Sequence, residues 1–143
     1  MKTTWFQDFR LVDIGRLAYE QALQIQESLV NKRIVGFSHD CLVIGEHPPV
    51  VTIGRSGSLK DLRVSKEALQ EKGVNVYHVD SGGMATFHGP GQLVVYPILK
   101  LKKRDLHLYL QTVTDVIAAL LQTYGLNPEF KRGSPVFGWV LPR

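Results

Sequence analysis

The chain carries at residues 81–98 the stretch SGGMATFHGPGQLVVYPI, in which a glycine pair and a histidine precede a β-rich run. Glycine adopts positive φ and lets the main chain approach a bound molecule closely, whereas Pro90 fixes one φ between two glycines. Backbone of this composition is typical of a ligand-binding loop. We expect His88 to project its imidazole into the concavity that the loop forms.

The same stretch resembles the signature of the lipoate-protein ligase B family, the octanoyltransferases of lipoic acid synthesis. That signature reads Arg-Gly-Gly-x-x-Thr-Tyr-His-Gly-Pro-Gly-Gln-Leu-Val-x-Tyr-Pro-Ile. A second segment at residues 45–55, GEHPPVVTIGR, is similar to the family's Glu-His-Pro-Pro-Val-x-Thr-Leu-Gly. The resemblance runs from about Phe9 to Trp139, which is nearly the whole chain but only the N-terminal part of the family domain.

The resemblance implies a two-step transfer without ATP, metal or other cofactor. Octanoyl passes from acyl carrier protein to an enzyme cysteine, and then to a lysine of the lipoyl domains of 2-oxoacid dehydrogenases and glycine cleavage H protein. The octanoyl ligand is expected to lie along Ser81, Gly82, Gly83, Met84, Ala85, Thr86, Phe87 and His88. Within this stretch the imidazole would donate to a carbonyl or thioester oxygen, and the glycine amides and the threonine hydroxyl would bind the same ligand.

Two departures from the family pattern bear on activity. The family's nucleophilic cysteine and its lysine follow a Gly-Val-Trp-Val-like segment, whereas here PVFGWV at residues 135–140 is followed only by Leu141, Pro142 and Arg143. We therefore assign no catalytic residue within the 143 residues and expect that pair beyond Arg143, with the last strands and helix of the domain. Ser81 stands where the family has arginine, and Ser-Gly-Gly before a histidine resembles the adenylating lipoate ligases and a related group of octanoyltransferases.

Composition sets the broad class. With 143 residues, 44% of them hydrophobic and 21% charged, residues 1–143 are expected to form one domain. No apolar run approaches the roughly 18 residues that span a bilayer, and residues 1–10 lack a secretory apolar region, so a cytoplasmic protein without a membrane partner is expected. A single cysteine excludes an internal disulfide and a cysteine-based zinc site.

Basic residues gather in two places, at Lys100, Lys102, Lys103 and Arg104 and again at Lys131 and Arg132. They are either ordinary solvated surface or a docking patch for an acidic partner such as acyl carrier protein. No nucleic-acid partner is expected, because basic and aromatic residues do not interleave and no known binding module is present.

The expected elements alternate short strands with two substantial helices. Asp13 is expected to cap the first helix, whose apolar stripe Ala18, Ala22, Ile25 and Leu29 reaches about Lys32, and Asp105 to cap the second, which ends at Gly125. A short helix runs from Ser65 to Gly73. Strands are expected at residues 5–12, 41–44, 50–54, 74–79, 92–98, 126–130 and 136–141.

This order predicts an α+β fold with a mixed, largely antiparallel sheet and packed helices. The family resemblance implies, more specifically, the fold of the biotin/lipoate protein ligase catalytic domain with its C-terminal part missing, which would leave one sheet edge exposed.

Other candidate residues carry two interpretations each. His47, beside Glu46 and before two prolines, either orients a partner side chain or holds the turn by a hydrogen bond, and the turn is favoured. Cys41 is interpreted as a small buried hydrophobe and not as a nucleophile. His39 and Asp40 fit no zinc spacing, and His78 and His107 are assigned no role.

Three functions stay open at this point. The first is the octanoyltransferase. The second is an ATP-dependent lipoate or biotin-type ligase, which nucleotide binding would reveal. The third is a noncatalytic acyl-binding remnant, which the nucleotide sequence past Arg143 would identify through a Lys-Ile and Pro-Cys-Gly continuation in any frame.

Overall fold

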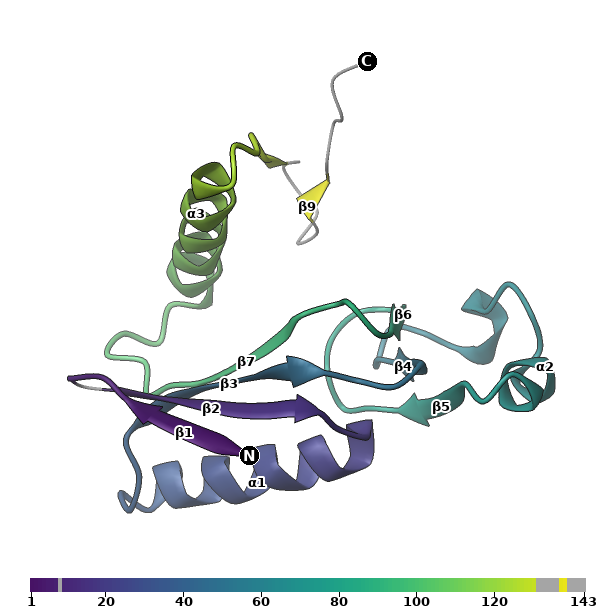
Figure 1. Ribbon diagram of the computed structural model, residues 1–143, viewed down its shortest axis with the longest axis horizontal. Helices are drawn as coiled ribbons and strands as arrows, with labels where there is room; N and C mark the ends of the chain where they lie inside the picture. The colour runs from purple at the N-terminus through teal and green to yellow at the C-terminus, as the bar shows by residue number, and fades with distance from the viewer. Residues whose placement is uncertain (8, 131–136, 139–143) are drawn as a thin grey trace. The chain divides into compact units, whose positions relative to one another are not determined.

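A computed structural model describes residues 1–7, 9–130, 137 and 138 (Figure 1). Its contacts divide the chain into two compact units, Met1–Lys100 and Leu101–Arg143, and each is described by itself. The single domain over residues 1–143 stays a prediction.

The first unit contains a four-stranded sheet in the order β1-β2-β3-β7. Its strands are β1 (Lys2–Trp5), β2 (Phe9–Arg16), β3 (Asp40–Glu46) and β7 (Val94–Ile98). β2 and β3 are parallel, and α1 (Tyr19–Ile34) connects them and lies along one face of the sheet (Figure 1). The core between helix and sheet consists of Val12, Ile14, Ala22, Leu29, Cys41, Val43 and Ile98.

The start of α1 corrects one prediction. Asp13 does not cap the helix; it lies within β2, where its Oδ1 accepts the N–H of Gly15 (2.8 Å). The helix begins after Ala18, whose side chain offers no cap. The reason is tertiary: β2 continues to pair with β3 as far as Arg16, and this ladder overrides the local capping preference of an aspartate. The apolar stripe is confirmed at Ala22 and Leu29, which are buried.

β2 contains one extra residue relative to β3. Asp13 pairs with Ile44, but the next pair joins Arg16 to Glu46, so three residues of β2 match two of β3. Such a β-bulge re-aims the side chains that follow it. Here it sets Arg16 opposite Glu46 at the end of the sheet.

The second sheet has the order β5-β4-β6, with β4 (Val50–Ile53), β5 (Asn75–His78) and β6 (Ala85–His88). The strands predicted at 41–44 and 50–54 both form, but they belong to different sheets, because residues 47–49 carry the chain from one sheet to the other. All four residues of β4 are buried. The turn with two prolines is therefore the passage between the two sheets.

Two short helices lie between β4 and β5: η1 (Leu59–Asp61) and α2 (Lys66–Glu71). The Ser65 hydroxyl accepts the N–H of Ala68, and Gly73 follows α2 with φ of 72°, so the predicted short helix is confirmed. β5 then begins one residue later than predicted, at Asn75.

The ligand-binding loop predicted from the sequence is only partly a loop. Residues 85–88 form β6, which pairs antiparallel with β4 and sets Ala85 opposite Ile53 and His88 opposite Val50. It is only four residues long and its partner β4 is distant in sequence, so local sequence patterns did not predict this strand.

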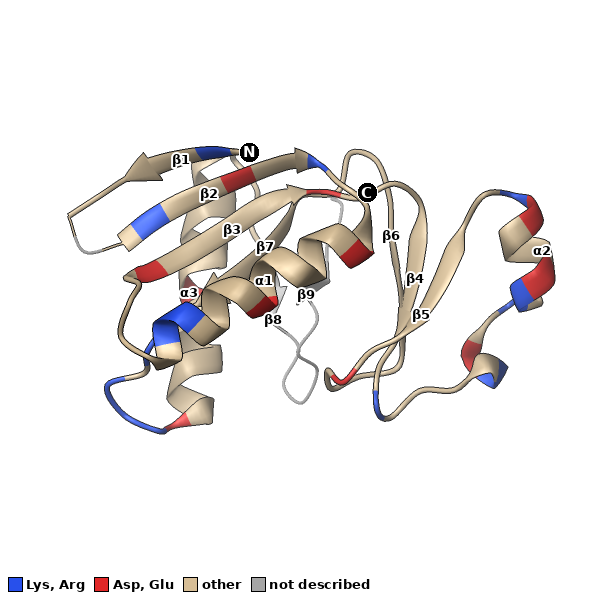
Figure 2. Ribbon diagram, turned by 90° about the horizontal axis from the view of Figure 1, so that it is seen from below, with Lys and Arg blue, Asp and Glu red and all other residues tan. Residues whose placement is uncertain are grey.

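The second unit contains α3 (Leu106–Thr123) and a hairpin of β8 (Glu129–Phe130) and β9 (Phe137–Gly138). The Asp105 carboxylate accepts the N–H of Leu108 (2.9 Å), which confirms the predicted cap. The remainder of the predicted final strands, and Lys131 and Arg132, lie outside the described residues. The basic residues of 100–104 are exposed, and they colour the segment before α3 blue in Figure 2.

The fold class predicted from the sequence is confirmed. Of the six strand pairs that the described residues form, four are antiparallel and two parallel. Within the described part of the chain, no helix has both the length and the apolar character needed to cross a membrane.

Candidate functional site

The glycine loop before β6, residues 81–84, is hydrogen-bonded through its carbonyl groups to the residues that follow β4. The N–H groups of Arg55, Ser56 and Gly54 donate to the oxygens of Ser81 (2.9 Å), Gly83 (3.1 Å) and Met84 (3.0 Å). Residue 54 has to be glycine, because a Cβ there would lie 2.6 Å from the oxygen of Gly83 and 2.9 Å from that of Ser81. Gly54 is thus the residue against which the backbone of the loop packs.

While three of its carbonyls bond the residues that follow β4, the loop leaves its amides without an acceptor among the described residues. The N–H groups of Ser81, Gly82 and Gly83 donate to no group in the described part of the chain, and all three residues are exposed. Successive free N–H groups form a site for the oxygen of a carbonyl, carboxylate or phosphate. Met84 and Phe87, which follow in the chain, are apolar residues that are 59% and 57% exposed.

His88, at the end of β6, is half-buried and contacts Gln92: its Nδ1 lies 3.2 Å from the side-chain oxygen Oε1. Burial lowers the pKa of His88 below its ordinary value, and the neighbouring His47 lowers it further, against an opposing effect of Gln92. The imidazole is therefore neutral at pH 7. Thr86 is exposed on the same strand.

His47 lies behind His88, with ring centroids 6.3 Å apart, and is fully buried. Its Nδ1 donates to the carbonyl of Leu17 (2.7 Å), so in the neutral ring Nε2 accepts from the hydroxyl of Tyr96 (2.7 Å). Burial raises the pKa of Tyr96 to about 12, so this hydroxyl keeps its proton. These bonds confirm that His47 holds the turn after β3, and Tyr96 is its partner that sequence reasoning missed.

Glu46 joins three segments of the site. Its Oε2 accepts the N–H of Gly91 (3.1 Å) and the guanidinium of Arg16 (3.2 Å). The bond from Gly91, and then that from Arg16, lower the pKa of this carboxyl. Sequence reasoning gave no role to Glu46, Gln92 or Gly54, although all three lie inside the two family-like motifs.

Cys41 has the properties of a packing residue. It is a free thiol in the core of the first sheet, 1% exposed, and burial raises its pKa. A thiol in that state is a poor nucleophile. Among the described residues, no three histidine, cysteine or acidic side chains gather in a way that would hold a metal ion.

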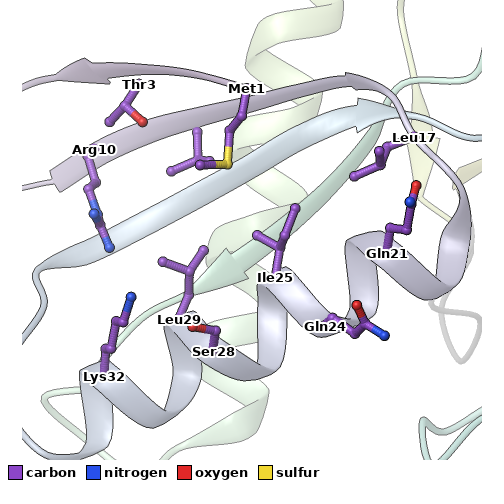
Figure 3. Close-up of a pocket in the computed structure, with 11 residues that line it drawn as sticks. Met1, Thr3, Arg10, Leu17, Gln21, Gln24, Ile25, Ser28, Leu29 and Lys32 are labelled. Carbon is purple, nitrogen blue, oxygen red and sulfur yellow. The ribbon is translucent and has the colours of Figure 1, made fainter.

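A groove of about 510 Å³ lies between α1 and the strands β1 and β2 (Figure 3). Five of its eleven lining residues are apolar, and Arg10 and Lys32 lie near one end (Figure 3). None of the residues predicted to bind ligand lines it: His88 belongs to β6 in the second sheet, and the loop of residues 81–84 precedes that strand.

Comparison with known proteins agrees with this architecture. The chain is 46% identical to an octanoyltransferase of Rubrobacter xylanophilus over 114 residues, which are 79% of the chain and 52% of that protein. It is 38% identical to an octanoyltransferase of Parabacteroides distasonis over 135 residues, 90% of the chain and 61% of that protein. The chain thus spans about half the length of the curated relatives it matches.

Solved structures share the fold. A lipoate-protein ligase A bound with ATP superposes with a TM-score of 0.73 at 18% identity, over 86% of the chain and 49% of that protein. A bi-partite lipoate protein ligase from Thermoplasma acidophilum gives a TM-score of 0.66 at 17% identity, over 89% and 49%. Residues 18–137 match the family described as lipoyl protein ligase A/B catalytic domain. Because the chain's curated relatives are octanoyltransferases, the chain belongs to that family, and within it to the lipoate-protein ligase B group.

Proposed function

We propose that the protein is an octanoyltransferase of lipoate biosynthesis, which moves octanoyl from acyl carrier protein to a lysine of lipoyl domains, and that these residues supply the acyl-binding part of it. The observation that carries the proposal is the loop of residues 81–83: the carbonyls of Ser81 and Gly83 accept from the residues after β4, and the amides have no acceptor in the described part of the chain. Free amides suit the carbonyl oxygen of a thioester, because that oxygen accepts hydrogen bonds.

Exposed apolar side chains lie in the same segment and shortly after it. Met84 and Phe87 are more than half exposed although both are apolar, and Leu93, after the Gly91 turn, is 62% exposed. We infer that the octanoyl chain lies against these side chains. Removing their apolar area from water favours binding in proportion to the area covered.

The chemical step needs a thiolate, and Cys41 does not provide it. It is the one cysteine of the 143 residues, it is buried, and its pKa is raised. We infer that the cysteine and lysine of the reaction belong to the half of the relatives' length that these residues do not span. The proposal requires neither ATP nor metal, and it sets the reaction in the cytoplasm.

The exposed basic residues before α3 suit the acidic donor. Lys100, Lys102, Lys103 and Arg104 follow one another closely, and an acidic carrier protein approaches such a patch faster and in a preferred orientation. We propose that acyl carrier protein docks there and that lipoyl domains are the acceptors.

The experiment is a titration of the ¹⁵N-labelled chain with S-octanoyl-N-acetylcysteamine, with the acetyl thioester as control. The largest amide shifts should fall within residues 81–88 and require the octanoyl chain. If His88 donated to the thioester oxygen, as the sequence suggested, His88→Ala would weaken binding by on the order of 1 kcal/mol, the value of one hydrogen bond, whereas His107→Ala would not. Shifts confined to α3 would refute the proposed site.

Ser81 favours one second candidate, an ATP-dependent lipoate ligase. The ligase B signature has arginine at this position, and the Ser-Gly-Gly sequence resembles the adenylating ligases. Free loop amides would suit an adenylate phosphate as well as a thioester. Titration with ATP and magnesium separates the two: shifts at residues 81–83 with nucleotide and none with the octanoyl thioester would replace the first proposal by the second.

A further inference from the structure

The contact between His88 and Gln92 fixes which ring nitrogen of the histidine carries the proton. The acceptor atom is the amide oxygen Oε1, 3.2 Å from Nδ1, and an oxygen of this kind can only accept. Nδ1 therefore carries the proton. In a neutral imidazole the other nitrogen, Nε2, then has a free lone pair, and it donates to nothing.

Gln92 is itself held in place by a series of contacts from the first sheet. The neighbouring Gly91 donates its N–H to Glu46 (3.1 Å), and Gln92 donates its own N–H to the carbonyl of Gly89 (3.1 Å), which closes the turn after His88. Arg16, set opposite Glu46 by the bulge in β2, donates to the same carboxylate oxygen. The tautomer of His88 thus depends on residues of β2 and β3.

A lone pair on Nε2 changes which part of a substrate His88 can face. The sequence suggested that His88 donates to a carbonyl or thioester oxygen, but two lone pairs repel each other, so Nε2 does not bind an oxygen of that kind. It binds a donor. The free N–H groups of Gly82 and Gly83 in the preceding loop are the donors that suit the carbonyl. The site thus has its hydrogen-bond donors in the glycine loop and its acceptor, Nε2, at His88.

We propose that His88 Nε2 accepts a hydrogen bond from the side-chain amine of the acyl-accepting lysine, and that Gln92 and Glu46 are positioning residues which hold His88 in the tautomer that does so. The inference rests on the proposed function, because it takes the lysine of that reaction as the donor. Burial keeps the ring uncharged, so a lysine ammonium approaching it meets no repulsion.

The tautomer is tested first, with long-range ¹H–¹⁵N spectra of the imidazole at pH 8, where the ring is neutral. The wild-type chain should show a protonated Nδ1 and an unprotonated Nε2. Gln92→Ala should shift the population toward the other tautomer, whereas Gln92→Glu, which keeps an acceptor oxygen, should restore it. Glu46→Ala should act in the same direction as Gln92→Ala, and Gln122→Ala, a glutamine of α3, should change nothing. A wild-type spectrum with the proton on Nε2 would overturn the proposal.

The amine contact is tested in the same chain with Nα-acetyl-lysine-N-methylamide. Nα-acetyl-norleucine-N-methylamide, which has the same backbone but no amine, is the control. The lysine compound should shift the Nε2 resonance, and Gln92→Ala should weaken its binding on the order of tenfold, the value of one hydrogen bond to a charged group.

Equal effects of the two compounds would overturn the amine contact, even if the octanoyl thioester still shifts residues 81–83. A lysine-specific shift with no response to the thioester would instead support the amine contact and refute the acyl site. The two outcomes therefore separate this inference from the proposed function on which it rests.

Discussion

Replacing Gly54 by alanine should damage the site more than any other single methyl group added to the glycine loop or its support. The new Cβ would lie 2.6, 2.8 and 2.9 Å from the oxygens of Gly83, Gly82 and Ser81, distances at which backbone has to move. If the loop stays, the overlap costs about 1–3 kcal/mol, as overpacking in a core does. If the loop moves away, its hydrogen bonds from Gly54, Arg55 and Ser56 are lost at about 1 kcal/mol each.

Both routes lead to a loss of about 2–3 kcal/mol in the free energy of unfolding, measured by urea denaturation. Gly82→Ala is the matched control, because it lies in the same loop with no atom within 4 Å of the added Cβ and an ordinary φ. It should change the free energy by no more than about 0.5 kcal/mol. Equal stabilities of the two variants, with unchanged amide shifts at residues 81–84 in Gly54→Ala, would refute the close packing of loop and strand.

Three further predictions concern charge, thiol chemistry and capping. Burial lowers the pKa of His88, so the folded state binds a proton at this imidazole less readily than the unfolded state does. The free energy of unfolding should therefore be highest above about pH 6.5 and fall as the pH drops toward the folded pKa. His88→Gln should remove this part of the pH dependence in urea titrations at pH 5 and 7.5, and an unchanged difference between the two pH values would assign it to another group. Cys41 should react with iodoacetamide at pH 8 far more slowly in the folded chain than in urea. The intact mass of the chain after incubation with octanoyl-acyl carrier protein should show no adduct. An adduct on Cys41 would mean that this thiol is a nucleophile. Asp105→Ala should lower the free energy of unfolding by about 1 kcal/mol and speed hydrogen exchange in the first turn of α3. Asp115→Ala, in the middle of the helix, should have a smaller effect. Equal exchange rates in the two variants would contradict the cap.

The sequence predicted best those features that depend on nearby residues. Ser65 and Asp105 cap their helices because a cap needs only a hydroxyl or carboxylate three residues before an N–H. The same rule failed at Asp13, since pairing with β3 extends β2 past it. Local chemistry predicts a cap well only where no distant strand competes for the backbone.

The sequence identified the segment expected to form the site, but not the contacts that this segment makes with the rest of the fold. The residues from Ser81 to His88 were expected to bind ligand from their composition and family resemblance, and that role stays a prediction. The contacts that shape the segment join residues far apart: Glu46 with Gly91, His47 with Tyr96, and Gly54 with the loop. No periodicity or spacing encodes such pairs, because they arise only when β7 returns beside β3 and β6 beside β4.

The buried imidazole of His47 sets an order for folding. One of its partners, the Leu17 carbonyl, comes earlier in the chain, but the other, the Tyr96 hydroxyl, is available only after β7 has joined β3. Burying the ring before that moment would leave one nitrogen unpaired away from water, at a cost of about 1–3 kcal/mol. We therefore expect the turn of residues 47–49 to close late, when β7, the last strand of the first sheet, is in place. Synthesis from the N-terminus delays it further, because a ribosome has to release residue 96 before the turn at residue 47 acquires its final contacts.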